Sequence, residues 1–124
     1  MQTGRIEITQ RFGFDAAHYL AEAPSGSNRR MHGHSFYAEV TLCGEPDPEK
    51  GWVRDFTEVH AVLTSIRGEL DHQVLNDIAG LGAPTLENLA RYIFGQAKAQ
   101  MPEVCRVRLL RPSSGQSCIY REEG

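Results

Sequence analysis

Two histidines stand one residue apart in Met31-His32-Gly33-His34-Ser35-Phe36, at the entrance to an alternating run of apolar and polar residues. Residues i and i+2 of a strand point to the same face, so His32 and His34 can bind one metal ion, each at about 2.0–2.1 Å. A third ligand is predicted at His18, where an earlier alternating segment ends, because a hairpin would bring it beside the pair. Three neutral imidazoles with an open fourth position are typical of a catalytic zinc site. By itself, His-Gly-His also fits two polar residues on a half-exposed strand.

The residues on both sides of this stretch predict two strands that each bury one face. Downstream, apolar positions alternate with mostly polar ones: Phe36, Ala38, Val40 and Leu42 against Tyr37, Glu39, Thr41 and Cys43. Upstream, the apolar positions have the same parity: Ile6, Ile8, Phe12 and Phe14 against Arg5, Glu7, Thr9 and Arg11. Residues 21–30, between the two strands, have turn composition throughout. We expect them to form a mobile loop beside the metal site, and such loops often carry function.

The middle of the chain predicts two amphipathic helices. The first is expected over residues 56–69, with an apolar face made of Phe56, Val59, Val62, Leu63 and Ile66. His60 lies off this face and is interpreted as a solvated helix histidine. The second helix has Thr85 as its N-cap and Pro102 as its end, and its buried stripe is made of Leu86, Leu89, Ala90, Ile93, Phe94 and Ala97. With two last strands over 104–110 and 117–121, the order is ββααββ, which predicts one α+β domain over residues 1–124.

The overall composition favours a small-molecule ligand. The chain has 124 residues and a formal charge of -3, and its charges are scattered rather than gathered in a basic stripe, which argues against nucleic acid as the main partner. The three cysteines, Cys43, Cys105 and Cys118, have no CxxC spacing, so we expect them to be reduced and packed. The first residues lead into strand-like alternation, and no apolar run approaches membrane-spanning length. These features predict a soluble, cytoplasmic protein without a membrane partner.

A second chemically suggestive pair is Asp71-His72. A carboxylate beside an imidazole can fix its tautomer and raise its basicity. Neighbouring residues in a regular strand or helix do not face each other, so the pair needs a loop conformation to act together. The alternative is a polar cluster at a helix C-terminus.

Six segments together resemble one known family, that of 6-pyruvoyltetrahydropterin synthase and the 6-carboxytetrahydropterin synthase of the queuosine pathway. They occur in the family's order and span nearly the whole chain. The segments are Phe14-Asp15-Ala16-Ala17-His18, His32-Gly33-His34-Ser35-Phe36, Gly51-Trp52-Val53-Arg54-Asp55-Phe56, Leu70-Asp71-His72-Gln73-Val74-Leu75-Asn76, Pro84-Thr85-Leu86-Glu87-Asn88 and Cys118-Ile119-Tyr120-Arg121.

The resemblance implies a tunnelling fold, in which a four-stranded antiparallel sheet carries two helices on one face. Subunits of this family join their sheets into a barrel as homotrimers, which commonly stack as homohexamers, and the active site lies between subunits. Nothing in the sequence separates trimer from hexamer.

The resemblance also implies the chemistry of the site. His18, His32 and His34 would bind Zn²⁺, which in the family holds side-chain oxygens of dihydroneopterin triphosphate. A cysteine and an Asp-His pair move protons as triphosphate leaves, and Asp71 and His72 match that pair. Thr85 and Glu87 match residues that hold the pterin from a neighbouring subunit, although both also suit a helix N-terminus.

The sequence departs from the family at two positions. Asn28 stands where the family has its cysteine, and an amide cannot shuttle a proton as a thiol can. Neither Ser27 nor Arg29 replaces the thiol well, since the hydroxyl needs a strong base and arginine does not deprotonate.

The second departure concerns a glutamate that accepts hydrogen bonds from the pterin edge. Its place is taken by Arg111 or Pro112, depending on where one extra residue is placed. An arginine would favour a ligand with acceptors at that edge. The alternative is that Arg111 points to solvent. Arg30, just before His32, is a candidate contact for a triphosphate, or simply a surface arginine.

The leading hypothesis is a zinc-dependent lyase that acts on a reduced pterin or a related bicycle, with His72 as the general base oriented by Asp71. Because one proton donor is missing, only part of the family reaction is expected, for example carbon–carbon cleavage or tautomerisation. The alternative is a non-catalytic paralogue that keeps zinc and pocket to bind a pterin-like or purine-like ligand.

Overall fold

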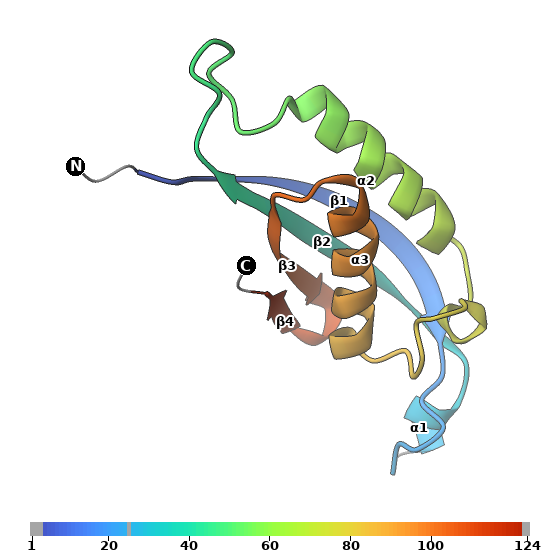
Figure 1. The fold of residues 1–124 in the computed structure, drawn as a ribbon. Coiled ribbons are helices and arrows are strands. Elements are labelled where there is room, and N and C mark those ends of the chain that lie inside the picture. Colours follow the sequence, from blue (N-terminus) through green and yellow to red (C-terminus); the bar gives the residue numbers. More distant parts are fainter. Residues whose placement is uncertain (1–3, 25, 123–124) are drawn as a thin grey trace.

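The computed structural model describes residues 4–24 and 26–122, and its centre is one antiparallel sheet in the order β1-β2-β3-β4 (Figure 1). The four strands are β1 (Ile6–His18), β2 (His32–Gly44), β3 (Val104–Arg111) and β4 (Gln116–Arg121). The long strands β1 and β2 pair from Ile6↔Gly44 to His18↔His32. Each strand therefore lies beside the next one in the sequence, and the predicted ββααββ order is confirmed.

The parity predicted from the sequence decides which side chains form the core. Ala38, Val40 and Leu42 are fully buried, and Phe36 is 1% exposed. On β1 the same parity buries Phe12, Phe14 and Ala16, and the ring of Phe14 stacks on that of Phe36 with centroids 5.2 Å apart. Residues of one parity share one face of a strand, so this face of the sheet is the interior face.

Two long helices cover the interior face, as expected: α2 (Phe56–Leu70) and α3 (Leu86–Gln100) (Figure 1). The predicted stripe of α3 is buried except at Leu86, which is half-buried. The prediction for α2 is wrong at Phe56, which is 50% exposed because it is the first residue of the helix and lies beyond the core. None of the described helices is both long and apolar enough to cross a membrane.

The segment between β1 and β2 differs from the prediction. The turn composition of residues 21–30 predicts a loop, but four of these residues form a short helix, α1 (Gly26–Arg29). The segment is tied back on itself, since the Leu20 amide donates to the Asn28 carbonyl and the Arg29 guanidinium donates to the Ala23 carbonyl at 2.9 Å each. These closing bonds use backbone carbonyls, which composition does not reveal.

The start of α2 provides a test of the fold. The Asp55 carboxylate accepts a hydrogen bond from the Thr57 amide at 2.9 Å and so caps one of the unpaired donors of the first turn. We expect Asp55→Ala to lower the free energy of unfolding by about 1 kcal/mol, measured by urea denaturation. Asp55→Asn keeps a side-chain acceptor and is expected to stay near wild type. Equal loss in both variants would contradict the capping role.

Candidate functional site

The three predicted metal ligands lie close together at the end of β1 and the start of β2. His18 pairs with His32 in the last register of the two strands, and His34 is two residues further along β2 on the same face. One ligand nitrogen from each residue lies within 4.8 Å of the other two. The residues that can hold a metal are therefore assembled within a single chain.

Hydrogen bonds to backbone carbonyls fix the orientation of two of these rings, those of His18 and His32. The Nδ1 atom of His18 lies 2.8 Å from the Pro84 carbonyl oxygen, and that of His32 lies 2.7 Å from the Arg30 carbonyl oxygen. A carbonyl can only accept, so each Nδ1 carries the proton and each Nε2 presents a lone pair. Ring N–H groups held by backbone carbonyls are the usual outer support of metal-binding histidines.

The spacing of the two Nε2 atoms tests whether a metal fits. They are 3.1 Å apart, and with both Nδ1 atoms protonated two lone pairs face each other at that distance. Such an arrangement is repulsive unless a cation lies between the two atoms. Two nitrogens bound tetrahedrally at about 2.0–2.1 Å would be about 3.3 Å apart, which is close to the observed spacing. The histidines therefore fit a small divalent metal ion.

The charge states of these histidines also suit a metal. Burial lowers the pKa of His34 to about 4, and the positive charge of Arg111 contributes to the shift. Burial lowers the pKa of His18 as well, although its hydrogen bond to the Pro84 carbonyl opposes the shift. Both rings are neutral at neutral pH, which is the form that binds metals.

Asp71 and His72 meet in the loop conformation that the pair requires. His72 has a positive φ of 61°, an unusual value for a residue other than glycine, and its Nδ1 lies 3.0 Å from Asp71 Oδ2. The side chain of His72 is 79% exposed. A ring whose Nδ1–H is held by a carboxylate has Nε2 free to accept a proton. The local geometry is thus that of an oriented base.

Asp15, which the sequence did not single out, holds this loop in place. Its amide donates to Asp71 Oδ1 at 2.9 Å, and its carbonyl accepts from the His72 amide at 2.7 Å. The Asp15 amide is the main reason that the pKa of Asp71 is lowered, and His72 and Arg67 add to the effect. Asp71 therefore stays ionised opposite His72.

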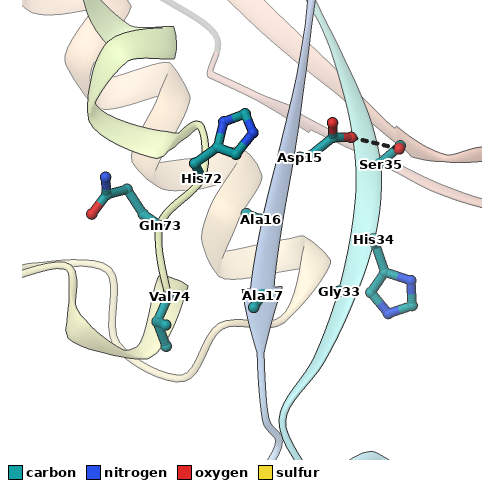
Figure 2. A pocket seen from close by; sticks show the side chains of 9 residues that line it. All are labelled: Asp15, Ala16, Ala17, Gly33, His34, Ser35, His72, Gln73 and Val74. Carbon is teal, nitrogen blue, oxygen red and sulfur yellow. Dashed lines mark hydrogen bonds between the residues drawn. The ribbon is translucent and has the colours of Figure 1, made fainter.

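A cavity of about 500 Å³ lies beside this loop (Figure 2). It is lined by Asp15, Ala16, Ala17, Gly33, His34, Ser35, His72, Gln73 and Val74. The Ser35 hydroxyl donates to the Asp15 carboxylate at 2.5 Å within it. Strand β1 separates the loop of His72 from β2, and Figure 2 shows the His34 ring pointing away from His72. In one chain, the candidate base and the metal ligands thus do not face each other.

The remaining predicted residues are spread around the metal ligands. Thr85 caps α3 by accepting from the Asn88 amide at 3.2 Å, and Glu87 is exposed in the first turn of that helix. Arg30 is exposed, and its backbone carbonyl serves His32. Asn28 is exposed on α1 and is not among the residues that line the cavity. Arg111 is half-buried, and its positive charge contributes to the lowered pKa of His18 and His34.

Sequence reasoning missed the groups that act through the backbone. The carbonyls of Pro84 and Arg30 orient two histidines, and the backbone of Asp15 orients the base. Every residue has such groups, so no residue type signals them. One signal was available for Pro84. It stands immediately before Thr85, the N-cap of α3, where the backbone is expected to be well fixed.

Comparison with known proteins agrees with this arrangement. The profile of the 6-pyruvoyl tetrahydropterin synthase family matches residues 7–123. A 6-carboxy-5,6,7,8-tetrahydropterin synthase of Synechocystis is 38% identical over 109 residues, covering 83% of this chain and 84% of that protein. A dihydroneopterin monophosphate aldolase of Pyrococcus furiosus is 34% identical over 106 residues, covering 86% and 87%.

Among solved structures, the 6-pyruvoyl tetrahydropterin synthase of Caenorhabditis elegans superposes with a TM-score of 0.83 at 23% identity and 99% coverage of both chains. This likeness supports the fold, and the sequence matches support the relationship. The chain belongs to the 6-pyruvoyl tetrahydropterin synthase family.

Proposed function

We propose that the protein is a zinc-dependent lyase that cleaves a carbon–carbon bond in the side chain of a reduced pterin. The observation that carries this proposal is the set of three convergent histidines, two of which present Nε2 lone pairs 3.1 Å apart. The two relatives described above act on pterins, one as a synthase and one as an aldolase. Aldolase-type cleavage is the simpler of the two reactions for this chain.

The residues divide the work as follows. His18, His32 and His34 hold the metal, and a bound zinc ion supplies a Lewis acid for a side-chain oxygen of the substrate. His72 takes a proton from a substrate hydroxyl group at Nε2, and Asp71 stabilises the imidazolium that results. The carbon–carbon bond beside that hydroxyl then breaks to leave an aldehyde, and its electron pair passes to the adjacent imine of the pterin ring. The imidazolium returns the proton to the side-chain carbon that stays on the ring. Arg30, exposed beside His32, is positioned to meet a phosphate group of the substrate.

We propose a cleavage instead of the full synthase reaction because Asn28 stands at the position of the family's cysteine. A synthase reaction moves protons at more than one position, and the chain lacks the thiol that would serve the second. The Asn28 amide can hydrogen-bond a substrate oxygen but cannot exchange a proton at neutral pH. A cleavage that needs one base is compatible with His72 alone.

A complete site requires a second copy of the chain. Within one chain, β1 lies between the His72 loop and the strand that carries His34. We therefore propose a homotrimer or homohexamer in which His72 of one subunit faces the metal of another, with Thr85 and Glu87 contacting the pterin across the interface. This arrangement also places an exposed base in a site closed to bulk water.

The test is incubation of the zinc-loaded protein with dihydroneopterin triphosphate, and separately with dihydroneopterin monophosphate, followed by mass-resolved product analysis. A metal-stripped sample is the control. Zinc-dependent release of the hydroxylated side-chain fragment supports the aldolase reaction, whereas loss of triphosphate with the side chain retained supports a synthase. No product from either substrate would contradict the proposal.

Asn28 also favours a second candidate, a binding protein that retains the metal and pocket without turnover. The two candidates differ in the expected result of Asn28→Cys. If the pocket is an intact pterin site that lacks one proton carrier, this substitution creates synthase products detectable by mass. A binding protein instead shows saturable stabilisation by pterins in a thermal melt and no product in either form.

A further inference from the structure

Arg111 is the last residue of β3 and lies on the interior face of the sheet. Val107 and Leu109, at the same parity, are fully buried. Leu110 pairs with Tyr37 on β2, so the end of β3 runs alongside the part of β2 that follows His34. The side chain of Arg111 therefore starts from the same face as the three metal-binding histidines.

The guanidinium of Arg111 is held by its own hairpin. Its Nε donates to the Ser114 hydroxyl at 2.9 Å, and one terminal nitrogen donates to the Gln116 side-chain oxygen. The turn between these residues is a short 3₁₀ helix, Pro112–Ser114, closed by Gly115 in the left-handed conformation. The cation is thus fixed in orientation before any ligand arrives.

This cation has no carboxylate partner of its own. Within residues 4–24 and 26–122, no ion pair involves Arg111, although it is half-buried. Arginines of that kind are usually paired, because burying an unpaired charge is unfavourable. Its side chain starts from the same face of the sheet as His18, His32 and His34, where a bound divalent metal would add two further positive charges. An excess of positive charge on one face of a protein attracts an anion.

We propose that Arg111 forms an oxyanion-binding subsite beside the metal centre, and that the ligand presents a carboxylate, phosphate or ionised ring oxygen there. The guanidinium offers remaining N–H donors in a fixed plane, which matches two oxygens of such a group. This inference rests on the proposed function, which supplies the bound metal and the pterin-like ring of the ligand. It adds that the ligand carries a negative charge near Arg111. The competing explanation is that Arg111 only closes the β3–β4 hairpin.

The experiment measures binding to the zinc-loaded full chain by calorimetry, with three kinds of probe. Pterin-6-carboxylate against 6-methylpterin tests a side-chain carboxylate. Lumazine above its ring pKa, against 1,3-dimethyllumazine, which has no ring proton to lose, tests an ionised ring oxygen. Inorganic phosphate tests a phosphate. The variants are Arg111→Gln and Arg111→Lys, with Arg121→Gln as the matched control because Arg121 is an exposed arginine on β4. Thermal melts and metal content show that each variant is folded and loaded.

We expect wild type to prefer at least one anionic probe over its neutral counterpart by about tenfold or more, and Arg111→Gln to abolish that preference. Arg111→Lys should retain part of it, and Arg121→Gln all of it. The probe that responds identifies the source of the oxyanion. An unchanged preference in Arg111→Gln, or no anion preference in wild type, overturns the subsite.

The outcome is separable from that of the proposed function, which is judged by turnover. If wild type makes product but the anion preference does not depend on Arg111, only the subsite fails. If the preference depends on Arg111 and no pterin is converted, the subsite stands and the lyase proposal fails.

Discussion

Replacing His72 with alanine is expected to lower kcat by about 10²–10⁴-fold while leaving the metal content unchanged. Within residues 4–24 and 26–122, the ring is the one imidazole outside the metal ligands that has a carboxylate on Nδ1, so its Nε2 is the expected proton acceptor. Its backbone sits at φ 61°, a conformation that non-glycine residues adopt at a cost and that often marks functional positions. The measurement is steady-state turnover of the pterin substrate that proves active.

Two controls make this result specific. His60→Ala removes an exposed histidine on α2 whose nitrogens contact only Gln10 and Thr64 among the described residues, and it should leave kcat near wild type. Asp71→Asn should also lower kcat, because it keeps the base but removes the carboxylate that holds the proton on Nδ1. Full activity in His72→Ala would show that another group acts as the base.

Replacing His18 with alanine should abolish both metal binding and turnover. His18 is 1% exposed, its Nδ1 lies 2.8 Å from the Pro84 carbonyl oxygen and its Nε2 lies 3.1 Å from that of His32, so the substitution removes a buried, oriented ligand. Metal bound per chain, measured by elemental analysis after dialysis, is expected to fall from about one ion to none.

The same variant should lose the stabilisation that metal gives to the folded state. At free zinc concentrations of 100 to 1,000 times the dissociation constant, wild type gains about 2.7–4.1 kcal/mol, seen as a rise in Tm. His18→Ala should show no such rise, whereas His60→Ala should behave as wild type. Stoichiometric metal in His18→Ala would mean that the ion binds elsewhere.

Most of the fold follows from short-range patterns in the sequence. The parity of Phe36, Ala38, Val40 and Leu42 defined the buried face of β2, and the spacing of Leu89, Ile93 and Ala97 defined that of α3. These patterns are readable because a strand and a helix repeat with fixed periods. The same rule failed at Phe56 since a period does not show where the core ends.

The sequence by itself also indicated which residues can bind a metal, because His32 and His34 share a face in any strand and a hairpin brings His18, at the end of the preceding strand, beside them. Only the tertiary structure decided how these rings are oriented, through carbonyls of Pro84 and Arg30 that lie 66 and two positions away from the histidines they serve. It also decided that Asp71 and His72 face each other, through the backbone of Asp15, 56 residues from Asp71. Backbone groups are the same in every residue, so their partners are set by how distant segments pack and not by any pattern along the chain.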